Sequence, residues 1–344
     1  MDLKEIIKNL TTKSGISGDE FSASEYACEL LNNYLDCHID CFGNVYGESK
    51  NFDEKKPTIL LDAHIDEIGM IVTYITDEGF LKVSNCGGVD ARLLLAQEVD
   101  VLCESQIING VITSTPPHLE TDNTKAPEIK DIFVDIGMSK EQAETIVSLG
   151  DRVYIKNPLI SLQGNKITSN ALDDRSGVAS ILYALELLKD KENKYNIAVL
   201  FSCQEEVGEI GAEIGSYNVE PDLAIAVDVS FAKTNGESPC DCGEMGKGPM
   251  IGVAPTLSRE MSNDLISIAK SNKIPYQVEV MSGKTGTNAD AIGVVKGGVK
   301  TCTVSIPLKY MHTPVEVVSI EDVENTGKLI AKFCEGGYWL WLIC

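Results

Sequence analysis

Five short motifs hold the residues of this sequence that could do chemistry. Together they supply two histidines and several carboxylates, each on or near an apolar run with the character of a strand. Imidazole and carboxylate groups are ligands for divalent metals. Two metals that share one carboxylate can activate water and polarise a carbonyl group, which is hydrolase chemistry. The motifs are Ala63–Glu67 (AHIDE), Asn170–Arg175 (NALDDR), Gln204–Gly208 (QEEVG), Ala226–Asp228 (AVD) and Tyr310–Pro314 (YMHTP).

His64 follows a predicted strand over 58–62. Open α/β sheets bind ligands at the carboxyl ends of their strands, so His64 stands where a ligand is expected. Asp66 lies two residues on and shares its face in extended backbone, so its carboxylate could orient the imidazole. A histidine satisfied by core hydrogen bonds is the alternative. Only four histidines occur, and both His64 and His312 lie in ligand-like motifs, which favours metal binding.

The acidic pair Asp173 and Asp174 precedes a helix predicted to begin near Ser176. Carboxylates at that place also stabilise a helix through its dipole, which accounts for one acid. We predict that Asp173 bridges two metals and that Asp174 forms a supporting pair with Arg175.

Glu205 and Glu206 follow the most apolar predicted strand, 196–203. Neighbouring side chains in extended chain point opposite ways, so one acid could bind metal while the other acts as a general base. A solvated turn is the alternative. Asp228 ends another predicted strand, and His312 follows a further one before a proline that restricts the backbone. These complete the set of ligand candidates.

Alternating strand and helix patterns predict the scaffold around these motifs. After residue 165 the strands lack polar alternation, which is typical of a mostly parallel sheet covered by helices on both faces. The predicted helices span 3–13, 23–36, 176–189, 259–272 and 320–334, and the predicted strands span 39–47, 58–62, 196–203, 223–227, 276–281 and 301–306.

A different pattern fills residues 69–163. The apolar runs there are short and closely spaced, which predicts a small β-barrel or sandwich inserted into the first domain. Ser139 and Gln142 form a capping-box pattern that predicts a helix over 140–149. The polar, proline-containing stretch 115–130 predicts a mobile loop.

Composition limits the partners. The chain of 344 residues is long enough for one large domain or two ordinary ones, and its net charge of −23 opposes binding to nucleic acids and anionic membranes. A strongly negative net charge is also common in proteins simply because it favours solubility.

No apolar run approaches 18 residues, so no membrane span is predicted. The first residues lack the apolar stretch of a signal peptide, which predicts a cytoplasmic protein with reduced thiols.

Two features have no clear place in this scheme. Cys240 and Cys242 form a close pair without a second pair or a nearby histidine, which disfavours a structural zinc site. The segment 338–344 is apolar and could pack on the core or at a subunit contact.

The motif set resembles the M42 family of metallo-aminopeptidases, also called glutamyl or tetrahedral aminopeptidases, some of which were labelled cellulase M endoglucanases. The resemblance covers about residues 3–331 and includes a sixth segment, 286–292. Lys300 and Lys309 stand where many members carry proline and arginine. The segments that carry the resemblance are AHIDEIG, NALDDRSG, QEEVGEIGA, AVDVS, GTNADAI and YMHTPVE.

The resemblance implies an α/β fold: a zinc-peptidase-like α/β/α catalytic domain (1–68 and 164–344) with an inserted PDZ-like β-barrel domain (69–163) that mediates dimerisation. It implies a homo-oligomer, in many members a tetrahedral dodecamer. Two divalent metal ions are implied, zinc first, with cobalt or manganese as substitutes.

The resemblance also implies a role for each site residue. One metal would be held by His64, Asp173 and Asp228, and the other by Asp173, Glu206 and His312. Glu205 would be the general base, and Asp66 would orient His64. A metal-bridging hydroxide would then attack the first peptide bond of a short peptide.

Two other functions compete with the aminopeptidase interpretation. A glycoside hydrolase would need two carboxyl groups across a sugar ring and no metal. A non-catalytic metal-binding protein would not need Glu205.

Overall fold

The computed structural model describes residues 1–114, 118, 126–235 and 242–336. The features noted above at Cys240 and 338–344 lie outside the described residues, as does most of the predicted loop 115–130. Within the described part, no helix has the length and apolar character needed to cross a membrane.

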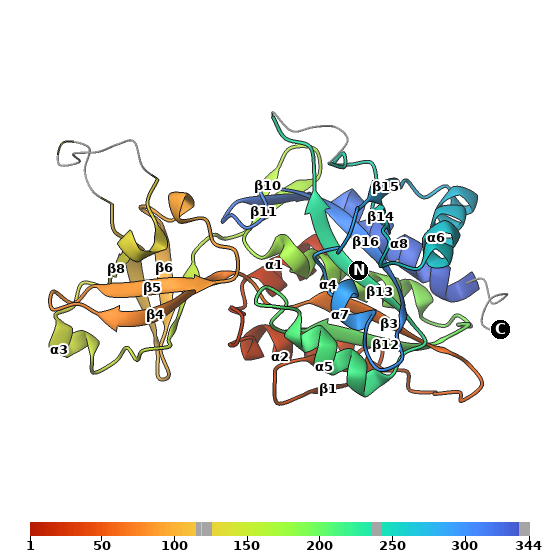
Figure 1. Ribbon diagram of the computed structural model, residues 1–344, viewed down its shortest axis with the longest axis horizontal. Coiled ribbons are helices and arrows are strands. Elements are labelled where there is room, and N and C mark those ends of the chain that lie inside the picture. Colours follow the sequence, from red (N-terminus) through yellow and green to blue (C-terminus); the bar gives the residue numbers. More distant parts are fainter. Residues whose placement is uncertain (115–117, 119–125, 236–241, 337–344) are drawn as a thin grey trace.

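An eleven-stranded sheet forms the centre of the larger part of the molecule (Figure 1). Its four middle strands run parallel, and nearly all their residues are buried, because helices cover both faces. In spatial order these strands are β12 (Asn196–Ser202), β3 (Thr58–His64), β13 (Leu223–Phe231) and β16 (Lys300–Lys309).

Successive residues of these strands alternate between two apolar layers. In β3, Ile59 and Leu61 face the larger layer, and Leu60 faces the smaller one. The larger layer is covered by α1 (Leu3–Thr11), α2 (Phe21–Leu31), α4 (Leu172–Leu188), α6 (Arg259–Asn272) and α8 (Ile320–Gly336), and the smaller by α5 (Ile210–Val219) and α7 (Ala289–Ile292).

Shorter strands extend the sheet on both sides. A hairpin pairs with β12 at one edge, three strands continue beyond β16 at the other, and two more branch from β16. They are β1 (Asp36–Ile39) and β2 (Val45–Glu48), then β17 (Glu316–Ser319), β11 (Lys166–Ser169) and β10 (Ile160–Leu162), and finally β14 (Met250–Val253) and β15 (Gln277–Val280).

A closed barrel of six strands forms the other part, at the left of Figure 1. It has its own apolar core, separate from the layers of the sheet. The predicted α/β fold with a β-rich barrel is confirmed. The barrel consists of β4 (Gly69–Ile75), β5 (Leu81–Cys86), β6 (Glu98–Leu102), β7 (Ile107–Ile112), β8 (Phe133–Asp135) and β9 (Arg152–Ile155), with the short helix α3 (Lys140–Ala143) beside it.

Several predicted elements differ in extent from the observed ones, and two of them differ for a reason that the structure shows. The strand expected over 39–47 is a hairpin, because the Asp40 carboxylate accepts hydrogen bonds from the backbone of Phe42 and Asn44 and closes a turn. The helix expected over 140–149 ends at Ala143. The β-branched run that follows it has low helix propensity.

Helix α5 was missed because its sequence carries two glycines, which disfavour helices in isolation. The contacts explain the glycine at 211: a Cβ there would lie 2.2 Å from the carbonyl oxygen of Cys203. Asp228 was expected at a strand end, but β13 continues to Phe231 and Asp228 lies within it.

The predicted pair between Asp174 and Arg175 is wrong. Arg175 is fully buried and its Nη2 lies 2.8 Å from Glu67 Oε1. Its Nη1 donates to the carbonyl oxygens of Leu10 (2.7 Å) and Lys13. The guanidinium therefore ties the end of α1 to the segment after β3.

Replacing Arg175 with Ala should destabilise the protein by roughly 3–5 kcal/mol, because Glu67 would keep a buried charge without its partner. Urea denaturation followed by circular dichroism measures this loss. The control is Arg92→Ala, which removes an exposed arginine paired with Asp90 and should leave the midpoint unchanged. Equal midpoints for the two variants would contradict the anchoring role of Arg175.

Candidate metal centre

The parallel strands bring three of the five motifs to one edge of the sheet. His64 is the last residue of β3 and lies opposite Ser202, the last residue of β12. Glu205 and Glu206 lie in the turn after β12, which brings them near His64. Asp228 lies in β13, the other neighbour of β3.

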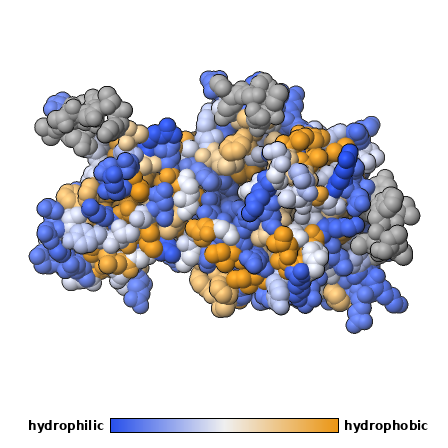
Figure 2. All heavy atoms as spheres, viewed as in Figure 1, coloured by the Kyte–Doolittle hydropathy of each residue, from blue (hydrophilic) through white to orange (hydrophobic). Residues whose placement is uncertain are grey.

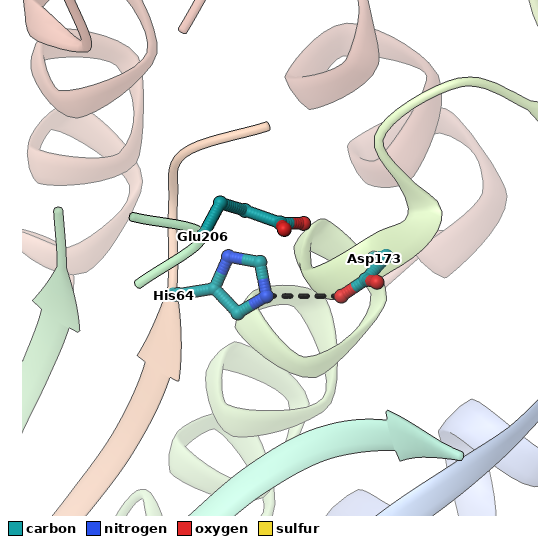
Figure 3. Close-up of side chains that lie close together, drawn as sticks. All are labelled: His64, Asp173 and Glu206. Carbon is teal, nitrogen blue, oxygen red and sulfur yellow. Dashed lines mark hydrogen bonds and ion pairs between the residues drawn. The ribbon is translucent and has the colours of Figure 1, made fainter. Parts of the chain in front are cut away.

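The side chain of Asp173 points toward His64, with Glu206 beside them (Figure 3). Its Oδ1 lies 2.9 Å from Nε2 of His64, and its Oδ2 lies 3.4 Å from Nε2 of His312. The same nitrogen of His312 lies 3.3 Å from Oε1 of Glu206. One carboxylate thus stands between two imidazoles, which is the arrangement expected of a bridging ligand.

Potential ligand atoms form two sets, and within each set the atoms lie within 4.8 Å of one another. One set comes from His64, Asp173 and Glu206, and the other from His64, Asp174 and Asp228. These sets contain four of the five residues predicted to bind metal, and the fifth, His312, lies against Asp173 and Glu206. Asp174 was not predicted to face this site. Its Oδ1 accepts the backbone N–H of Gly177, and its buried Oδ2 has no hydrogen-bond partner in the described part of the chain.

Negative charge dominates this centre. Within the residues described, no lysine or arginine forms an ion pair within 4.0 Å with any of its carboxylates. The carboxylates belong to Asp66, Asp173, Asp174, Glu205, Glu206, Asp228 and Glu316.

The burial and crowding of these carboxyl groups shift their pKa values and those of the neighbouring imidazoles. Burial, followed by the neighbouring carboxylates, raises the pKa of Asp174 and Asp228 well above the usual range, and burial raises the pKa of Glu205 to about 8. Hydrogen bonds to Asp173 and Glu206 raise the pKa of His312 to about 11. Burial opposes ionisation of Asp173, yet the two imidazoles lower its pKa.

The donor set fits divalent cations. All donors are nitrogen or oxygen atoms, and one of them is a buried oxygen without a hydrogen-bond partner among the described residues. Several of the carboxylates pair with the two histidines, and within the same residues no lysine or arginine joins them. Such groups are favoured in a protein interior when they are paired or coordinate a metal. The residues present could hold two cations, one on each side of Asp173.

Asp66 lies against His64 and also holds the backbone beyond β12. Its backbone oxygen lies 3.1 Å from Nδ1 of His64, and its Oδ1 lies 3.5 Å from the same atom. An Nδ1–H donated in this direction leaves Nε2 facing Asp173. The carboxylate also accepts the backbone N–H groups of Glu205 (3.0 Å) and Glu206 (3.2 Å).

Glu316 is a functional candidate that the sequence reasoning missed. Its carboxylate accepts the backbone N–H groups of Asp173 (3.1 Å) and His312 (3.0 Å), so one buried acid fixes two candidate ligands. Its only sequence signal is its place two residues after Pro314, inside the motif YMHTPVE.

A pocket opens beside Asp173, Glu206 and His312. Its volume is about 480 Å³, which includes the part that is open to solvent. The barrel contributes an apolar wall to it. The wall residues are Val89, Leu93, Leu94 and Ile155.

Residues 43–329 match the family model described as M42 glutamyl aminopeptidase. The chain belongs to the M42 peptidase family. It is 34% identical to a putative aminopeptidase of Acetivibrio thermocellus, over 96% of this chain and 98% of that one. It is 32% identical to the lysyl aminopeptidase of Pyrococcus furiosus, over 96% of both chains.

A solved structure agrees with the fold. The TET1 peptidase of Pyrococcus horikoshii, which can assemble into a tetrahedron or a large octahedral shell, superposes with a TM-score of 0.86 at 35% identity, over 97% of this chain and 99% of that one. The family and these relatives are aminopeptidases, which hydrolyse peptide bonds. The predicted family and enzyme class are thereby confirmed.

If the centre holds two zinc ions per chain, replacing Asp173 with Asn should lower that number to one or fewer, because the carboxylate lies between the two histidines. Calorimetric titration of the chelated protein with zinc measures the stoichiometry. Asp77→Asn, an exposed site on the barrel, is the control and should retain both. Two tight sites in the Asp173 variant would contradict the bridging role.

Proposed function

We propose that this chain is a two-metal aminopeptidase that removes N-terminal residues from short peptides. The observation that carries the proposal is the place of the Asp173 carboxylate, within 3.4 Å of the ring nitrogens of both His64 and His312. Family membership and the pocket beside this carboxylate support it.

The proposed ligands divide into two groups. His64, Asp173 and Asp228 would hold one cation, and Asp173, Glu206 and His312 would hold the other. Zinc is the first expectation for both, with cobalt or manganese as substitutes. Divalent cations at such a centre polarise a carbonyl group and make water a stronger acid.

Glu205 is the proposed general base. It is not among the grouped ligand atoms, whereas the side chain of neighbouring Glu206 is, and contacts His312. Burial holds the pKa of Glu205 above its usual range, which suits a group that takes a proton from water and delivers it to the leaving amine. Asp66 fixes the backbone of this residue, so the carboxylate has a defined direction.

The peptide would lie along the pocket between the sheet and the barrel. Its amino terminus is cationic and would be attracted by the acidic centre. The apolar wall that includes Val89 and Leu93 would contact side chains of the peptide. Cleavage at this place releases one residue from the amino end.

The barrel supports a proposal about assembly. We infer a zinc-peptidase-like catalytic domain (1–68 and 164–344) and a PDZ-like dimerisation domain (69–163). We infer that the chain forms a cytoplasmic homo-oligomer, a tetrahedral dodecamer, since the TET1 peptidase has been described as a dodecamer and can assemble into a tetrahedron. Exposed apolar side chains on the barrel fit such contacts, and Figure 2 shows apolar patches on one face of the molecule. The exposed barrel residues are Tyr74, Ile107, Val111 and Leu149.

Replacing Glu205 with Gln should leave zinc stoichiometry unchanged but lower kcat on aminoacyl chromogenic substrates by at least about 100-fold, because the general base is lost. Glu213→Gln, an exposed change on α5, is the control and should keep full activity. Full activity in the Glu205 variant would exclude the proposed base, and an inactive wild type would favour a protein that only binds metal.

Chelation should abolish hydrolysis of the aminoacyl substrates, and zinc, cobalt or manganese should restore it, because the carbonyl group depends on the cations for polarisation. A panel of substrates with acidic, basic and apolar amino-terminal residues, assayed after chelation with each metal, measures both metal dependence and preference. Activity on cellulose that resists chelation would instead support a glycoside hydrolase.

A further inference from the structure

Three consecutive backbone amides at the centre are held by two buried carboxylates. The N–H of Gln204 donates to Oε1 of Glu20 at 3.2 Å. The next two amides, those of Glu205 and Glu206, donate to the two oxygens of Asp66. These residues lie in a turn after β12, so the strand ladder does not fix them.

Both carboxylates are in turn held by one segment near the start of the chain, Gly15–Glu20. The hydroxyl of Ser17 donates to Oδ2 of Asp66 at 2.6 Å, which makes it the shortest hydrogen bond to that carboxylate. The backbone N–H of Gly18 donates to Oε1 of Glu20 at 2.7 Å. Ser17 and Glu20 are almost entirely buried.

The barrel contacts the backbone of this segment and of the end of α1. Arg152 of β9 donates from Nε to the carbonyl oxygen of Ser17 at 3.3 Å. Tyr154 of the same strand donates its hydroxyl to the carbonyl oxygen of Thr11 at 3.2 Å. Residue 17 therefore has the barrel on its backbone side and Asp66 at its side chain.

We propose that Ser17 is a positioning residue of the reaction, acting through Asp66 on the backbone of Glu205 and Glu206, and that Arg152 links its position to the barrel. This proposal rests on the proposed aminopeptidase function. Because one carboxylate anchors both amides, a rotation of Asp66 would displace the proposed base and a proposed ligand together. Displacements of about 1 Å at a catalytic group can cost about 100-fold in rate.

A graded series at position 17 tests the proposal. Ser17→Ala removes the donor, and Ser17→Cys keeps a weaker one. We expect kcat to fall about 10-fold or more in the Ala variant and by an intermediate factor in the Cys variant, with KM changed less than about 2-fold. The control is Ser216→Ala. It removes a hydrogen bond that another buried hydroxyl donates to the carbonyl oxygen of Ala212 in α5, and it should leave kcat unchanged.

Zinc affinity provides a readout that is independent of turnover. Calorimetry on the chelated proteins should show weaker zinc binding in Ser17→Ala than in Ser216→Ala, because the backbone of Glu206 is less well held. If the wild type hydrolyses no aminoacyl substrate, the proposed function fails, and zinc affinity alone then decides the role of Ser17. Unchanged kcat and unchanged zinc affinity in Ser17→Ala would overturn the proposal.

A double-mutant cycle tests the link to the barrel. Arg152→Met alone should lower kcat, and it should add little further loss in the Ser17→Ala background, because both changes act through one path. Fully additive losses would overturn this link.

Discussion

The crowding of buried carboxylates around Asp173 is the constraint on which the rest of the centre depends. Like charges at this spacing in a protein interior are costly unless a cation or a proton compensates them. Two imidazoles approach Asp173, and no lysine or arginine in the described chain pairs with the surrounding acids. The sheet makes the crowding possible because parallel strands end at one edge, and the hydrogen bonds of Asp66 and Glu316 keep the acids in place.

A second buried acid nearby is compensated differently. Glu67 pairs with Arg175, which also binds the backbone of the segment after α1. This pair fixes the start of the chain beside the centre, where Ser17 reaches Asp66. The contrast has a functional meaning: a permanent arginine satisfies the structural acid, whereas the acids around Asp173 are available to a cation.

The sequence allowed site residues to be predicted where a histidine or an acidic residue follows the end of a predicted strand. His64 and Glu206 could be recognised because a ligand-type side chain follows a buried apolar run, and the structure places them within one group with Asp173. Their roles as ligands stay predictions. Contacts between distant segments were beyond this reasoning: Arg175 and Glu67 are 108 residues apart, and adjacency alone suggested the wrong partner, Asp174.

Anomalous diffraction from crystals of the zinc-loaded protein tests the central claim most directly. We expect two zinc peaks per chain: one against His64 and Asp228, the other against Glu206 and His312, with Asp173 contacting both. A single peak, or peaks away from Asp173, would contradict it.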